Sequence, residues 1–168
     1  MRNAVILLTG LGLLLLQWII AWFVPYEHLT PILVLPVVLT MAVGEFSLAR
    51  GALLTFVLGY LTDAGSGGAL GLWTFTLVSV FLLARMVGLK LFLHGVVFQV
   101  LLTFLASIAA GVLMMGVLLV FDRRPVAVAS ALGVVAGQSL ATAACAPFVF
   151  AFVAGLPGVS SPRPDEAA

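Results

Sequence analysis

Charged residues are scarce in this sequence. Only 8% of its 168 residues are Asp, Glu, Lys or Arg, whereas a soluble domain carries about 25%. Seven basic and six acidic side chains cannot cover a surface that faces water, and 64% of the residues are hydrophobic. The shortage also excludes a nucleic-acid-binding protein, because no basic stripe is present to neutralise phosphates. The composition therefore predicts a chain that lies mostly within a lipid bilayer.

Residues that carry catalytic or metal chemistry are equally rare. Cys145 is the one cysteine, which excludes an internal disulfide, and its apolar neighbours favour a packing role. His28 and His94 are far apart in the sequence and are expected at opposite membrane faces, as interfacial side chains rather than ligands. Because no Ser–His–Asp set, carboxylate pair, metal cluster or phosphate loop is present, we expect no enzyme activity, cofactor or metal site.

What remains is a series of uncharged apolar blocks. None of them alternates with period two, as the strands of a membrane barrel do, so we predict an all-α integral membrane protein. The first block is longer than the apolar core of a secretory signal, about 7–15 residues, and is interpreted as a span. The prediction is one bundle of about six transmembrane helices over residues 1–156, followed by a disordered polar tail over 157–168. The six blocks are 3–26, 29–44, 51–62, 70–84, 95–121 and 125–156.

Three of these blocks have features that affect the helices. Block 51–62 would be about 18 Å long as a helix, against about 30 Å of hydrocarbon, so we expect a short, partial crossing unless residues 46–50 join it. Pro36 is expected to interrupt the second block, and Pro147 to kink or end the sixth helix.

Basic and aromatic residues indicate the orientation. Six crossings place both termini on one side, and a cytoplasmic N-terminus leaves five of the seven Lys and Arg residues inside. Arg123 and Arg124, the two on the outside, are the feature against this orientation. Glu45 and Arg50 flank the second connection and are expected to pair, contributing about 0–1 kcal/mol. Aromatic residues that fall at the predicted outer interface agree with it: Trp18, Trp22, Tyr26, Tyr60 and Trp73.

The stretch 50–73, RGALLTFVLGYLTDAGSGGALGLW, carries the clearest pattern. Gly51, Thr55, Gly59 and Asp63 are spaced by four and form a stripe of mostly small residues on one helix face. Small side chains let a second helix approach closely, which is how membrane helices pack. We therefore expect this stripe to bind the helix of a partner protein. A second packing face is formed by Gly133, Gly137 and Ala141, for which packing within the bundle is favoured over packing against a partner.

Asp63 has two open interpretations. It ends the third helix through an Asx-turn, or its carboxylate bonds the backbone or a side chain of a partner or ligand. At the C-terminal end of a helix the charge faces the negative end of the macrodipole, which is unfavourable.

The order of these elements resembles the bacterial rod shape-determining MreD family. The matching features are Pro31 early in the second block, Gly59 and Asp63, a turn of Ser66, Gly67 and Gly68, and Leu70 with Gly71 opening the next helix. The resemblance implies a six-helix fold like that of the substrate-binding subunits of energy-coupling-factor transporters. It also implies a non-enzymatic inner-membrane component of the cell-elongation machinery, which binds an MreC-like single-span protein. MreB filaments and the glycosyltransferase and transpeptidase pair of lateral peptidoglycan synthesis are its further expected neighbours.

The fold resemblance suggests an alternative, the substrate-binding subunit of a vitamin-type transporter. Asp63 and Trp73 would then contact the solute, because interrupted membrane helices often mark such sites. Few polar side chains are present that could form such a site, which usually needs several convergent polar groups. The main candidates are Gln17, Thr55, Gln99, Thr103, Gln138 and Thr142. A channel is less favoured, because rings of charge and a filter-like stretch are lacking.

Overall fold

The computed structural model describes residues 2–23, 30–44, 46–67, 70–87, 95–121 and 128–156. Within these ranges the chain forms six helices and no strand. The helices are α1 (Arg2–Phe23), α2 (Val34–Val43), α3 (Leu48–Ser66), α4 (Leu72–Met86), α5 (Val96–Phe121) and α6 (Val128–Ala154). Gly68, Glu45, His28, His94, the Arg123–Arg124 pair and the 157–168 tail lie outside the described residues, so the expected pairing of Glu45 with Arg50 stays a prediction.

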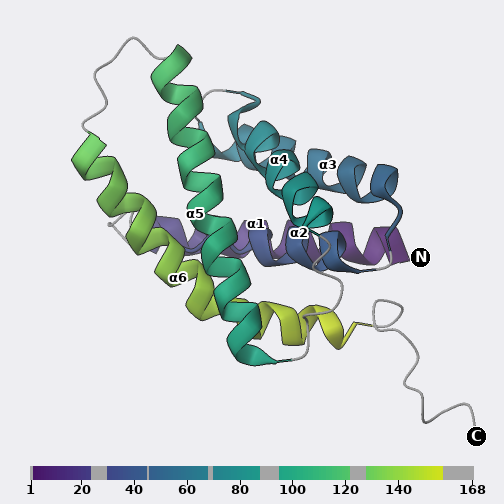
Figure 1. The fold of residues 1–168 in the computed structure, drawn as a ribbon. Coiled ribbons are helices and arrows are strands. Elements are labelled where there is room, and N and C mark those ends of the chain that lie inside the picture. The colour runs from purple at the N-terminus through teal and green to yellow at the C-terminus, as the bar shows by residue number, and fades with distance from the viewer. Residues whose placement is uncertain are drawn as a thin grey trace, which may run out of the picture.

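Three of the helices are long and apolar enough to cross a membrane, over Asn3–Phe23, Val96–Phe121 and Ala131–Ala154. Two shorter apolar helices, Val34–Val43 and Leu72–Met86, accompany them. Successive helices run in alternating directions in Figure 1, so that α1 begins and α6 ends on the right-hand side of the view. The chain is a multi-pass helical membrane protein.

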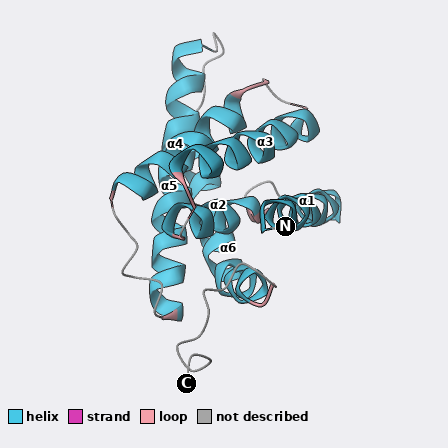
Figure 2. Cartoon of the chain, turned by 90° about the vertical axis from the view of Figure 1, so that its right-hand side faces the viewer, coloured by secondary structure: helices cyan, strands magenta, loops and turns pink. Residues whose placement is uncertain are grey.

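The short segment is α2, not the third helix. α2 has ten residues, all of them buried except the half-buried Thr40, and is about 15 Å long. It contacts all five other helices and lies among them in the end-on view of Figure 2. A helix that is apolar on every side is stable only when it is enclosed, which explains why this short, uniformly apolar segment forms the core.

The ends of α2 are completed by side chains from other helices. The backbone N–H of Ile32 donates to Thr142 Oγ1 (2.9 Å), and that of Leu33 donates to Gln17 Oε1 (3.0 Å). At the other end, Arg85 donates to the carbonyls of Ala42, Gly44 and Phe46 at 2.7–3.0 Å. Helix ends leave backbone groups without intrahelical partners, and the bilayer interior has no water to satisfy them. The side chains of α1, α4 and α6 therefore replace water at both ends of α2.

Two further expectations change in the structure. Of the two possibilities left open for block 51–62, the structure has the longer helix: α3 has 19 residues and is about 28 Å long. Leu48–Arg50 join it at one end, as the second possibility required, and Asp63–Ser66 join it at the other, which was not expected. Pro36 does not interrupt α2: it is the third residue of the helix, where a missing N–H removes no intrahelical hydrogen bond.

Pro147 does not end α6, which continues to Ala154. The helix bends in its second half in Figure 1, the half that contains Pro147. A proline inside a helix removes one backbone hydrogen bond and clashes with the preceding turn. The bend agrees with the expectation that Pro147 kinks the helix.

Replacing Arg85 with Met is expected to lower the free energy of unfolding by about 3 kcal/mol, because three buried carbonyls lose a charged donor. Unfolding of the purified protein by sodium dodecyl sulfate in mixed micelles measures this loss. Arg50→Met is the matched control, since Arg50 is exposed, and it should change stability by no more than about 0.5 kcal/mol. Equal stability of the two variants would contradict the role given to Arg85.

Candidate functional site

The carboxylate of Asp63 joins α3 to the beginning of α4. Its Oδ1 accepts a hydrogen bond from the backbone N–H of Trp73 (2.8 Å). Its Oδ2 accepts bonds from the backbone N–H groups of Gly71 and Thr74, both at 3.0 Å, and from the Thr74 hydroxyl at 2.6 Å. Asp63 is 1% exposed. Three donors share Oδ2 and one bonds Oδ1, and the burial of the side chain leaves little room for a ligand at the remaining position on Oδ1.

This arrangement makes Asp63 a cap for a helix to which it does not belong. The N-cap residue of α4 is Gly71, which has φ 95° and no side chain to bond the free N–H groups of the first turn. Asp63 supplies the missing acceptor from eight residues earlier. A carboxylate is stabilised at the positive end of a helix macrodipole. The unfavourable position near the end of α3 is thus offset by a favourable one at the start of α4.

Neither interpretation of Asp63 from the sequence describes this contact fully. The Asx-turn is wrong, because α3 continues to Ser66 and ends at Gly67, whose φ is 65°. The second interpretation named the right kind of bond, to a backbone and a side chain. However, the partner is the chain itself.

The small-residue stripe contacts α4 of the same chain. A Cβ added to Gly51 would lie 2.4 Å from Cζ of Phe81, and one added to Gly59 would lie 2.6 Å from Cα of Thr74. Thr55 is also fully buried. The face between Gly51 and Asp63 is therefore occupied, and a helix from another protein could reach it only if α3 and α4 separated.

The second small-residue face is packed in a different way. A Cβ on Gly133 would meet nothing within 4 Å, whereas one on Gly111 would lie 2.5 Å from Val135. Gly137 and Ala141 are half-buried. The contact between α5 and α6 thus includes a close approach of Val135 to Gly111, whereas Gly133 is open towards the surroundings of the chain.

Sequence reasoning missed the roles of four residues. Gln17 and Thr142 were considered as solute contacts, yet both bond the start of α2. Arg85 was counted only as a charge on the inner side. Gly65 was given no role of its own, but the ring of Trp18 occupies the place of its missing side chain: an added Cβ would lie 1.5 Å from Cζ2 of Trp18. A basic residue in the last turn of a helix was the available signal for Arg85, since such side chains bond free carbonyls.

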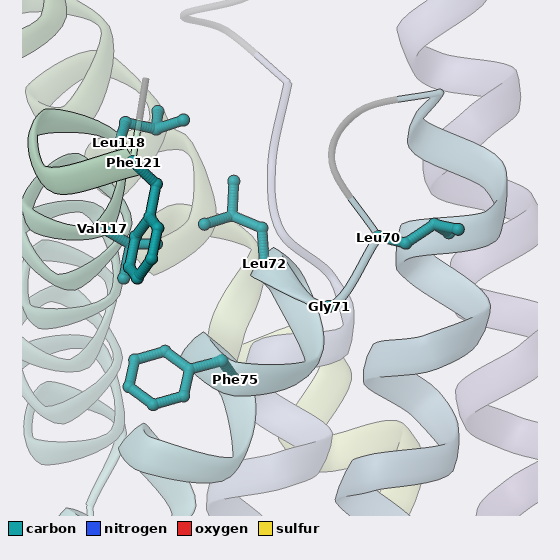
Figure 3. A pocket seen from close by; sticks show the side chains of 7 residues that line it. All are labelled: Leu70, Gly71, Leu72, Phe75, Val117, Leu118 and Phe121. Carbon is teal, nitrogen blue, oxygen red and sulfur yellow. The ribbon is translucent and has the colours of Figure 1, made fainter. Parts of the chain in front are cut away.

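A hollow of about 600 Å³ lies between the start of α4 and the end of α5 (Figure 3). Leu72 and Phe75 of α4 face Val117 and Phe121 of α5 across it, whereas Leu70 points away from the group. The side chains are hydrocarbon, and Phe75 and Phe121 are 53% and 80% exposed. This hollow provides a surface for lipid tails and no group for chemistry.

The chain matches no family model, no curated protein and no solved structure. Its fold and its capping contacts define a class, that of multi-pass helical membrane proteins.

Asp63→Asn should lower the free energy of unfolding by about 2–3 kcal/mol. An amide carries no charge, and its NH2 group cannot accept the bonds donated by Trp73 or Thr74. Thr74→Val removes one donor while leaving the carboxylate in place, so it should cost only about 1 kcal/mol. Detergent-denaturation curves of the three proteins test this order, and an Asp63→Asn protein as stable as the parent would refute the capping role.

Gly59→Ala and Gly12→Ala form a matched pair of helix substitutions. Alanine has a higher helix propensity than glycine, so Gly12→Ala, where nothing lies within 4 Å, should stabilise by up to about 1 kcal/mol. At Gly59 the new methyl group meets the α4 backbone, and the clash should destabilise by about 1–3 kcal/mol. Thermal unfolding followed by circular dichroism gives both values. The close approach of α3 and α4 would be in doubt if the two changes had the same sign.

Proposed function

We propose that this chain is a non-enzymatic scaffold of the bacterial inner membrane, which acts in cell elongation and helps to organise lateral peptidoglycan synthesis. The observation that carries the proposal is where the residues of the MreD-like pattern lie. Gly59, Asp63, Gly67 and Gly71 all belong to the joint between α3 and α4. Gly59 allows the close approach of α4, Asp63 caps α4, and Gly67 and Gly71 adopt positive φ. The pattern therefore has a role in folding and is not a chance run of glycines.

The partners proposed for this scaffold are an MreC-like single-span protein and, beside it, MreB filaments and the glycosyltransferase and transpeptidase pair. Support comes from the distribution of polar groups. Asp63, Gln17, Thr142 and Arg85 bond helix ends inside the bundle, whereas many large apolar side chains face outwards. A protein with this distribution acts through contacts within the bilayer. We propose that both termini are cytoplasmic, by the positive-inside rule.

The transporter alternative receives less support. Three of the groups considered for a water-soluble solute, Asp63, Gln17 and Thr142, already bond the backbone of this chain. A vitamin-type site needs several convergent polar groups in an apolar pocket, and these three are no longer available for it.

The proposal is tested by purifying the tagged chain from its native membrane and identifying the proteins that accompany it. Wall-elongation proteins should be recovered. Recovery of an ATPase module without them would overturn the scaffold and favour the transporter.

Gly133→Leu separates partner binding from folding. Because nothing in the chain lies within 4 Å of a Cβ at Gly133, the variant should keep its stability while its recovery of the single-span partner falls about tenfold or more, since small residues allow close helix approach. Gly12→Leu makes the same change on α1, where the space is also open, and should leave recovery unchanged. Unchanged recovery with Gly133→Leu would exclude this face of α6 from the interface.

A further inference from the structure

A second cavity, of about 330 Å³, lies where the start of α2, the start of α4 and the facing halves of α5 and α6 meet. Ile32 and Trp73 come from the two helix starts, Met114 and Leu118 from α5, and Val134 and Gln138 from α6. Its volume falls within the range of small-molecule sites, about 300–1,000 Å³.

The lining of this cavity is apolar apart from two side chains. None of the described residues that line it is charged. The side-chain carboxamide of Gln138 and the indole N–H of Trp73 make no hydrogen bond to another described residue, although both residues are half-buried. Their polar atoms keep accessible surface, so both groups are free to bond a molecule that enters the cavity. Two residues that line the cavity therefore carry donor groups, the NH2 of Gln138 and the indole N–H of Trp73, and one carbonyl acceptor, none of them bonded to a described residue.

Further polar groups lie one helical turn away. Ser107 precedes Gly111 by four residues on α5, and Ser139 follows Val135 by four residues on α6. Both hydroxyls are buried and have no partner among the described residues. Unsatisfied polar groups are thus concentrated at this part of the α5–α6 interface.

The surroundings of the cavity determine how an occupant reaches it. Val112 and Leu119 of α5 and Leu132 of α6 are exposed near it, so the approach lies through the apolar surface that faces lipid. An ionised head group would find no charged partner in the lining and would be costly to bury. The occupant must therefore enter from the bilayer and carry an uncharged head that both donates and accepts hydrogen bonds.

We propose that this cavity binds one molecule of an uncharged lipid with a hydroxyl-bearing head, and that Gln138 and Trp73 hold the head. Its apolar tail lies against Met114, Leu118 and Val134. This proposal does not depend on the partner proteins proposed above, because it concerns a cavity that is lined by residues of this chain.

Binding of radiolabelled monooleoylglycerol to the full chain in maltoside micelles tests the proposal. Binding should saturate at about one molecule per chain, and oleate, which has the same tail and an ionised head at pH 8, should not compete. Gln138→Leu should weaken binding about tenfold, the effect of about one lost hydrogen bond. Gln99→Leu is the matched control on α5, outside the cavity, and should bind as the parent does.

Ala131→Phe fills the cavity from a half-buried position and should abolish saturable binding. If this variant does not fold, as judged by circular dichroism, Gln138→Leu decides alone. No saturable binding to the parent chain, equal competition by oleate, or an affinity that Gln138→Leu leaves unchanged would each overturn the proposal. Loss of partner recovery in the purification described above would leave these lipid measurements unaffected.

Discussion

The structure depends on the need to satisfy backbone groups at helix ends where no water is present. Each free N–H or C=O in such surroundings costs several kcal/mol. The interhelical hydrogen bonds described above meet this need, apart from the bond between the Thr74 hydroxyl and Asp63, which joins two side chains. Asp63 completes the start of α4, Gln17 and Thr142 complete the start of α2, and Arg85 completes its end. Several of the few polar side chains thus lie where helix ends have free backbone groups.

This requirement explains how a ten-residue helix can form the centre of a membrane protein. α2 is too short to cross about 30 Å of hydrocarbon on its own, and both of its ends fall among the other helices. It is stable only with α1, α4 and α6 in place, since their side chains complete its ends. The long helices around it present apolar faces to lipid, whereas α2 is buried among them.

Hydropathy predicted the six segments, and the described residues form six helices near those positions, because transfer into lipid is decided by composition along the chain. It gave the wrong lengths for α2 and α3. Arg50 and Asp63 were treated as the limits of a block because charge is costly in lipid, but the bonds that Asp63 accepts allow α3 to continue past it. These partners lie 8–11 residues away. An Asp that precedes a glycine-rich turn and a helix start without a capping side chain therefore predicts that the Asp caps that helix. The bond between Ile32 and Thr142 joins residues 110 positions apart, and nothing local in the sequence indicates it.

α4 is fixed by polar contacts at both of its ends. Its first turn is held by the carboxylate of α3, and Arg85, in its last turn, holds the end of α2. A rigid helix held in this way transmits displacement along its axis. Any event that moves the start of α4 relative to α3 would draw the guanidinium away from the α2 carbonyls, so α4 mechanically couples the periphery of the bundle to its core.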